Sequence, residues 1–149
     1  MALNPTTVMH VVLSHLKTQG KVKQAQIGEP KQPPLGQLTA AILMDGIRTP
    51  SSVLDAPVLV YDLTVRLYRN FLEDGEQTEL EVARSVGEIM ESLHADFSLG
   101  GNSRAVDFMG MYGRAMDVTW GHLDFGSTIF RTADISVPLI VDPSAVFAA

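Results

Sequence analysis

The sequence contains no cysteine, which excludes disulfide bonds and every site that depends on a thiolate. It also lacks a long apolar run, since no stretch approaches the roughly 20 residues that a membrane-spanning helix needs. The N-terminal segment has neither the basic region nor the apolar core of a signal peptide. We therefore expect a cytoplasmic protein without membrane insertion. Its 149 residues, 46% of them apolar, fit one domain with an ordinary core.

Lysine is missing from most of the chain. All four lysines lie within the first 31 residues, where Glu29 is the only acid: Lys17, Lys21, Lys23 and Lys31. Residues 73–96, in contrast, carry eight acids and one arginine, and the whole chain has a net charge of −6. Binding to a DNA backbone needs clustered cations that release counterions. The charge balance therefore argues against a nucleic-acid-binding protein.

Motifs for catalysis are also missing. The chain has no G-x-S-x-G nucleophile elbow, no phosphate-binding loop and no dinucleotide fingerprint. Two His-x-Asp tripeptides, at 94–96 and 122–124, have a spacing that can chelate a metal. Their simpler interpretation is a polar helix end and a polar strand end, and the glycine pair at 100–101 is typical of a turn. We expect no enzyme, no cofactor and no metal site.

The first predicted helix begins near the N-terminus. Asn4 is a favourable N-cap, and Pro5 suits the first helical position because its missing N–H costs nothing there. Apolar residues then recur with helical spacing as far as Leu16.

The second predicted helix has a possible capping box, Thr78-x-x-Glu81, at its start. Behind it runs an apolar stripe and, opposite, an acidic stripe with Glu81, Glu88 and Glu91, which we expect to face solvent. Gly87 in the middle of the helix predicts a close backbone neighbour.

Alternating apolar and polar residues predict the strands. The clearest is Pro57–Arg69, which is long for a strand. Pro138 cannot donate a ladder hydrogen bond, so its strand is expected at a sheet edge or to carry a bulge. The other strands are expected at Leu38–Met44 before an Asp45-Gly46 turn, at Ala105–Tyr112, at Ala115–Leu123 and at Phe130–Asp142, with at most a short one around Gln24–Ile27.

This order predicts a single α+β domain over residues 1–149, in which two helices pack on one face of a mainly antiparallel sheet. Residues 21–37 are rich in proline and glycine and predict a flexible basic arm. Residues 143–149 form an apolar tail. The long strand and this tail favour a role in subunit assembly over catalysis.

The second half of the chain resembles the tail terminator (tail-completion) proteins of long-tailed bacteriophages, particularly those with actinobacterial hosts. The resemblance covers about residues 58–142 and consists of turn glycines and core positions, without a catalytic signature. It is carried by Leu99-Gly100-Gly101, Arg104, Val106-Asp107, Gly110, Gly113, Trp120-Gly121-His122-Leu123, Gly126, Phe130-Arg131, Ile135 and Val137-Pro138.

The resemblance implies a structural virion protein that forms a closed ring, usually a hexamer, at the head-proximal end of the tail. Its expected partners are copies of itself, the tail tube protein and a head-completion or stopper protein, while DNA passes through the lumen without specific binding. We expect subunit and partner contacts at Lys21, Lys23, Lys31, Arg66, Arg104, Trp120, Pro138 and Phe147.

Two alternatives stay open. The chain can be another phage neck or tail structural protein, such as a stopper or a tube subunit. It can also be a small-ligand-binding α+β domain with a glycine-lined pocket near Tyr112, Arg114 and Trp120.

Overall fold

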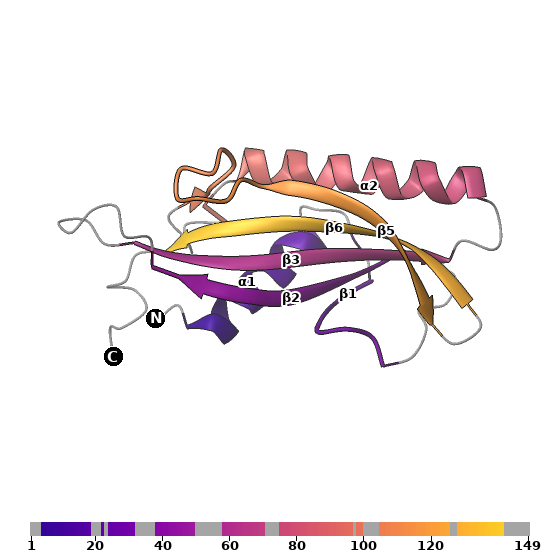
Figure 1. Ribbon diagram of the computed structural model, residues 1–149, viewed down its shortest axis with the longest axis horizontal. Coiled ribbons are helices and arrows are strands. Elements are labelled where there is room, and N and C mark those ends of the chain that lie inside the picture. Colours follow the sequence, from indigo (N-terminus) through magenta and orange to yellow (C-terminus); the bar gives the residue numbers. More distant parts are fainter. Residues whose placement is uncertain are drawn as a thin grey trace.

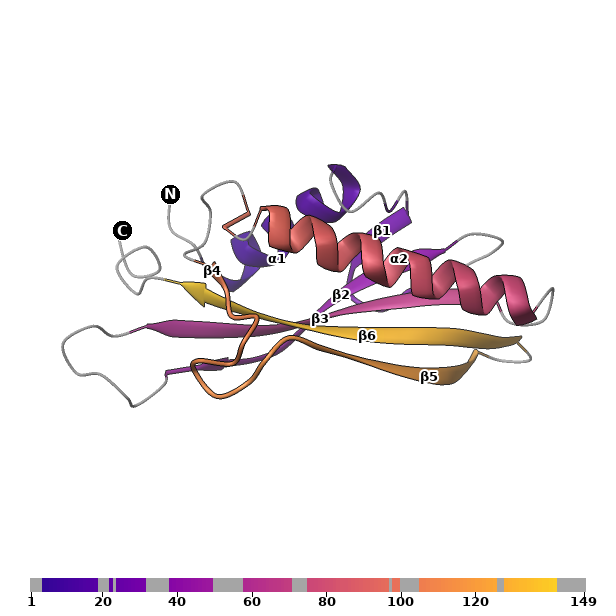
Figure 2. The ribbon, with the colours of Figure 1, turned by 90° about the horizontal axis from the view of Figure 1, so that it is seen from above.

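The computed structural model shows two helices on one face of a six-stranded, mostly antiparallel sheet, so the predicted α+β class is confirmed (Figures 1 and 2). The structure describes residues 4–18, 22, 24–31, 38–49, 58–70, 75–96, 98–99, 105–125 and 128–141. The element order is α1 (Pro5–Thr18), β1 (Gln24–Ile27), β2 (Thr39–Arg48), β3 (Leu59–Asn70), α2 (Gly75–Ala95), β4 (Ala105–Val106), β5 (Asp117–Phe125) and β6 (Thr128–Val141).

The strands lie in the order β1-β2-β3-β6, and β6 is bordered on its far side by β4 and β5 in succession. Only β1 and β2 are parallel. Helix α1 lies over β1 and β2, and α2 lies over β3 and β6. We call the side of the sheet under the helices the helix face and the other side the open face.

The core lies between the helices and the helix face. Alternate residues of β3 point into it, because side chains on a strand alternate between the two faces. Burial of each of these side chains stabilises the fold by about 1.5–3 kcal/mol. The core includes Val12, Leu16, Ile42, Tyr61, Leu63, Val65, Leu67, Val86, Ile89, Leu93, Ile135, Val137 and Leu139.

Helix α1 begins as the sequence predicts. The side-chain oxygen of Asn4 accepts a hydrogen bond from the Thr7 amide at 2.9 Å, which satisfies one of the amides that have no partner inside the helix. Gln24–Ile27 forms a short strand, also as expected.

The predicted capping box at the start of α2 is wrong. The helix begins at Gly75, and buried Thr78 donates its hydroxyl to the Asn70 carbonyl at 3.1 Å. Glu81 is not a free member of a solvated stripe, because it pairs with Arg69 on β3 at 2.7 Å. Gly87 has no neighbour within 4 Å of where a Cβ would lie, so the predicted close backbone contact is wrong.

The predicted turn at Asp45-Gly46 is wrong. Strand β2 continues to Arg48, and Asp45 is the extra residue of a bulge between Met44 and Gly46. The continuation is favoured because Ile47 and Arg48 find partners on β3, and because the Thr64 hydroxyl donates to the Asp45 carboxylate.

The prediction of an edge strand at Pro138 is wrong as well. Strand β6 pairs with β3 along its length, and Pro138 lies opposite Asp62. Its carbonyl accepts a hydrogen bond from the Asp107 amide at 2.8 Å, on the side away from β3. The N and C=O of one strand residue point to the same side, so the missing N–H faces the gap between β4 and β5. An inner strand tolerates proline at this position because no ladder hydrogen bond is lost.

The segment predicted as a strand at Ala105–Tyr112 is mostly a turn. Strand β4 is confined to Ala105–Val106, and residues 107–116 form a compact loop before β5. Strands β5 and β6 otherwise lie within a few residues of the predicted ranges.

Candidate interaction surface

The loop at residues 107–116 is the most unusual surface of the described chain. It presents Met109 and Met111 with 86% and 79% of their area exposed, far more than any other large apolar side chain described. We call it the methionine loop. Methionine is common at protein-binding surfaces because its flexible, polarisable side chain adapts to a partner.

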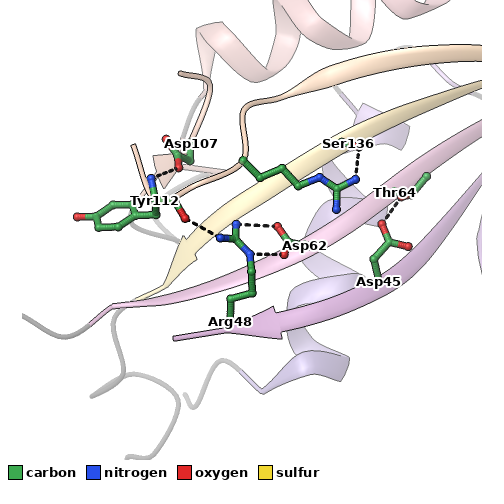
Figure 3. Close-up of polar contacts among 8 residues, drawn as sticks. Asp45, Arg48, Asp62, Thr64, Asp107, Tyr112 and Ser136 are labelled. Atoms are coloured by element: carbon green, nitrogen blue, oxygen red, sulfur yellow. Dashed lines mark hydrogen bonds and ion pairs between the residues drawn. The ribbon is translucent and has the colours of Figure 1, made fainter. Parts of the chain in front are cut away.

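Buried Asp107 organises this loop. One carboxylate oxygen accepts a hydrogen bond from the Met111 amide at 2.9 Å. The other accepts a hydrogen bond from the Tyr112 amide at 3.0 Å (Figure 3). Its own amide is held by the Pro138 carbonyl on β6. The turn is therefore fixed to the sheet at one end and closed on itself by a single carboxylate.

Two glycines make the tight path possible. Gly110 and Gly113 have positive φ angles of 73° and 110°, a region that other residues adopt at a cost. A Cβ on Gly110 would also lie 2.8 Å from the Ala115 nitrogen. The loop is thus shaped by backbone constraints before any partner binds.

The other end of the loop is anchored to the open face of the sheet. Arg48 on β2 donates to the Tyr112 carbonyl at 2.5 Å and forms a two-pronged ion pair with Asp62 on β3, at 2.6 and 3.1 Å (Figure 3). The hydrogen bond to Asp62 raises the pKa of Arg48. Arg114 donates to Ser136 on β6 at 3.2 Å.

Arg66 occupies the middle of the open face. It pairs with Asp134 on β6 at 2.7 Å and with Glu29 after β1 at 2.5 Å. The hydrogen bond to Asp134 raises its pKa. Because both partners are acidic, the guanidinium is neutralised within the chain instead of being offered to a ligand.

A groove of about 250 Å³ runs beside β5 on the sheet. Its lining includes two predicted contact residues, Arg66 and Trp120. Their side chains lie on opposite faces of the sheet, because Trp120 pairs with Ala133, whose side chain lies on the helix face, whereas Arg66 lies on the open face. The rest of its lining is mostly polar and comes from Thr119, Gly121, His122, Leu123, Thr132 and Asp134. Tyr112 and Arg114, which the sequence places near Trp120 in a glycine-lined pocket, are not part of the lining of this groove.

The other predicted contact residues are scattered. Lys31 is exposed beyond β1, and Pro138 is buried on β6. Lys21, Lys23, Arg104 and Phe147 lie outside the described residues, as do residues 32–37 of the predicted arm and the whole apolar tail. The methionine loop was missed because alternating residues at 105–112 favour a strand; the signal that could have found it is an Asp followed by two closely spaced glycines.

A Ser-His-Asp arrangement, which the sequence did not suggest, lies between the helices. His15 Nε2 is 3.0 Å from the Ser92 hydroxyl, and its Nδ1 is 3.9 Å from the Asp96 carboxylate. The Ser92 hydroxyl donates its hydrogen to the Ile89 carbonyl at 2.7 Å, so Nε2 carries the proton that it donates to Ser92. A nitrogen that already holds a proton cannot activate the serine, and His15 and Ser92 are both buried.

This contact instead joins α1 to α2. Burial lowers the pKa of His15, and the nearby Asp96 opposes that shift without reversing it. The neutral imidazole is therefore the form that the fold favours.

The two His-x-Asp tripeptides do not form a shared site. His94 stacks on Phe108 with ring centres 3.9 Å apart, and His122 lies opposite Arg131 on β6. Among the described residues, no group of three or more metal-ligating side chains occurs, and no helix is long and apolar enough to cross a membrane. The sequence matches no protein-family model and no curated protein.

Proposed function

We propose that the protein is a structural subunit of a phage tail, a terminator that forms a closed six-membered ring where the tail tube meets the head. The observation that carries this proposal is the pair of open sheet edges. Strand β1 borders the sheet on one side and β5 on the other, and neither has a second partner strand among the described residues. Edges of this kind on opposite sides of a domain suit head-to-tail assembly, which gives a ring when the rotation between neighbouring copies closes.

The methionine loop supplies the second surface that such a protein needs. A ring in a tail contacts its own copies and also the protein rings above and below it. A pre-ordered loop loses little conformational entropy on binding. We therefore assign the methionine loop to contact with a neighbouring protein, either the tail tube protein or a head-completion protein.

The surface chemistry supports a conduit for DNA better than a DNA-binding site. The chain carries a net charge of −6, and like charges keep a passing duplex from adhering. The arginines of the open face are held by acids or by other oxygen acceptors of the same chain. Such pairing reduces the positive charge available to phosphates.

Negative-stain imaging and native mass spectrometry of the purified protein test the ring. We expect particles with a central hole and a mass that is a fixed multiple of one chain, either alone or after addition of tail tube protein. Monomers under both conditions would overturn the proposal.

A tube-growth assay separates the terminator from its closest alternative, a tail tube subunit. A terminator added to polymerising tube protein stops elongation at short lengths, whereas a tube subunit is incorporated and elongation continues. The ligand-binding alternative is less favoured, because the arginine in the groove beside β5 already has two acidic partners.

A further inference from the structure

Strand β5 is an edge of the described sheet. It pairs with β6 through nine consecutive residues without a bulge, and no described strand pairs with its other side. Proteins commonly protect such an edge with charged side chains, above all lysine, or with proline or a bulge. The segment Asp117–Phe125 has no lysine, proline or bulge, and its only charged residues are Asp117 and Asp124, at or next to its two ends.

The ladder shows which backbone groups of β5 point away from β6. The Pro138 carbonyl points toward Asp107. The backbone N–H and C=O groups of the even-numbered residues of β6 therefore point toward β4 and β5, within the plane of the sheet. Their partners on β5 are odd-numbered, for example Thr119 opposite Asp134. The even-numbered residues of β5, such as Val118 and Trp120, therefore direct their N–H and C=O away from β6.

Strand β1 at the opposite edge also directs every second residue's backbone groups away from its partner strand. The Gly28 amide donates to the Ile42 carbonyl on β2 at 2.9 Å. The backbone N–H and C=O groups of the even-numbered residues of β1 therefore point toward β2. Ala25 and Ile27 therefore direct their backbone groups outward. Their side chains lie on the helix face, because their partners Ala40 and Ile42 do.

The directions of the two edge strands are complementary. Strand β1 runs parallel to β2, and each further step to β3, β6 and β5 reverses the direction. Strand β5 is thus antiparallel to β1 within one chain. A second copy that is rotated about an axis along the strands keeps the same strand directions as the first. Its β1 is therefore antiparallel to β5 of the first copy.

We infer that β5 receives β1 of a second copy, with Ile27 of that copy opposite Trp120 and Ala25 opposite His122. This inference rests on the proposed ring and identifies the edge contact that would close it. In this register every hydrogen-bonding group that β1 turns outward meets an outward-facing group of β5. The faces agree as well, since Trp120 and Ile27 both lie on the helix face.

The register also has a chemical basis. Trp120 is 39% exposed, which is high for an indole, and Ile27 would cover it.

The absence of native cysteine makes cross-linking a direct test. The variant Gln24→Cys with Leu123→Cys places both thiols on the open face, at a pair whose strands exchange no hydrogen bonds and whose side chains are therefore close. Within one chain these positions lie at opposite edges of the sheet, so a disulfide forms only between copies. After mild oxidation we expect a ladder of covalent multimers that ends at the ring.

The matched control is Gln24→Cys with His122→Cys, in which the second thiol is moved by one residue to the other face. It should give no ladder. If rings persist in negative stain but the variant Gln24→Cys with Leu123→Cys gives no ladder, this strand contact is overturned and the proposed ring stands. Monomers alone would overturn both, and a twofold dimer without larger species would indicate pairing of β5 with itself.

The wild-type protein provides a second measurement that does not depend on folding of a variant. Trp120 is the single tryptophan, so its emission should shift to shorter wavelength as the protein assembles. The backbone amides of Ala25, Ile27 and Trp120 should become protected from hydrogen exchange in the same concentration range. Assembly without either change would overturn the inference.

Discussion

The methionine loop offers a sharp test of how a single carboxylate shapes a surface. Asp107 accepts two backbone hydrogen bonds at 2.9 and 3.0 Å and is only 3% exposed. A hydrogen bond to a charged group contributes about 1.5–3 kcal/mol, but water can reach the exposed end of this loop and replace part of that amount. We expect Asp107→Ala to lower the free energy of unfolding by about 2–4 kcal/mol.

For a chain of this size, a loss of that magnitude corresponds to a decrease in Tm of about 5–15 °C. Urea unfolding followed by circular dichroism measures the loss, and hydrogen exchange at Met111 and Tyr112 locates it. Asp107→Asn keeps one acceptor and should fall between Ala and wild type. Glu91→Ala, at an exposed acid of α2, is the control and should change little. An Asp107→Ala protein as stable as wild type, with unchanged exchange in the loop, would refute the assigned role.

Three further predictions concern His15 and other residues of the methionine loop. The folded state lowers the pKa of His15 below its ordinary value of about 6.5, so the contribution of neutral His15 is complete above that pH and is lost as the pH falls through the folded pKa. Unfolding at pH 7 and pH 5 should show this acid sensitivity, and His15→Gln should reduce it. Gly110→Ala should destabilise the protein by at least about 1–2 kcal/mol, because alanine is strained at this positive φ and its Cβ would lie 2.8 Å from the Ala115 nitrogen. Met109→Ser with Met111→Ser should leave Tm within about 2 °C of wild type, since exposed substitutions cost little, yet rings of this variant should no longer stop tube growth; unimpaired capping would contradict the proposed docking role.

The helices and the long strand could be predicted because local patterns determine them. Val8, Val12 and Leu16 recur with helical spacing, and Tyr61, Leu63 and Val65 alternate with polar residues. Each pattern indicates that one side of its element is buried. In the structure, these residues of α1 and of β3 are indeed buried. Asn4 acts locally as well, so its capping role follows from the sequence alone.

Other residues are decided by contacts that are distant in the sequence. Thr78 and Glu81 fit a capping box by type, but Asn70 and Arg69 provide their partners. The dipeptide Asp45-Gly46 fits a hairpin turn, yet the ladder to β3 offers more hydrogen bonds than a turn would. In both cases a tertiary interaction replaces the local use of the same side chains.

Pro138 shows why a sheet edge is difficult to recognise from a sequence. Proline reports only that one N–H is missing, and a missing donor is tolerated wherever the neighbouring ladder is interrupted. On β6 the interruption comes from the change of partner between β5 and β4, which no local pattern records. The true edge, β5, contains Trp120 and has the composition of an ordinary strand.

The polar open face and the edges of the sheet have different consequences for assembly. On the open face, Arg48 and Arg66 already form ion pairs with Asp62 and Asp134. A partner that covered this face would have to break these ion pairs or remove their water. The outward-facing backbone groups of β5 have no such partner in the ladder, and a strand that met them would replace water at little cost in existing contacts. Among the described surfaces, this difference favours the sheet edges for contacts between copies and leaves the charged face suited to solvent.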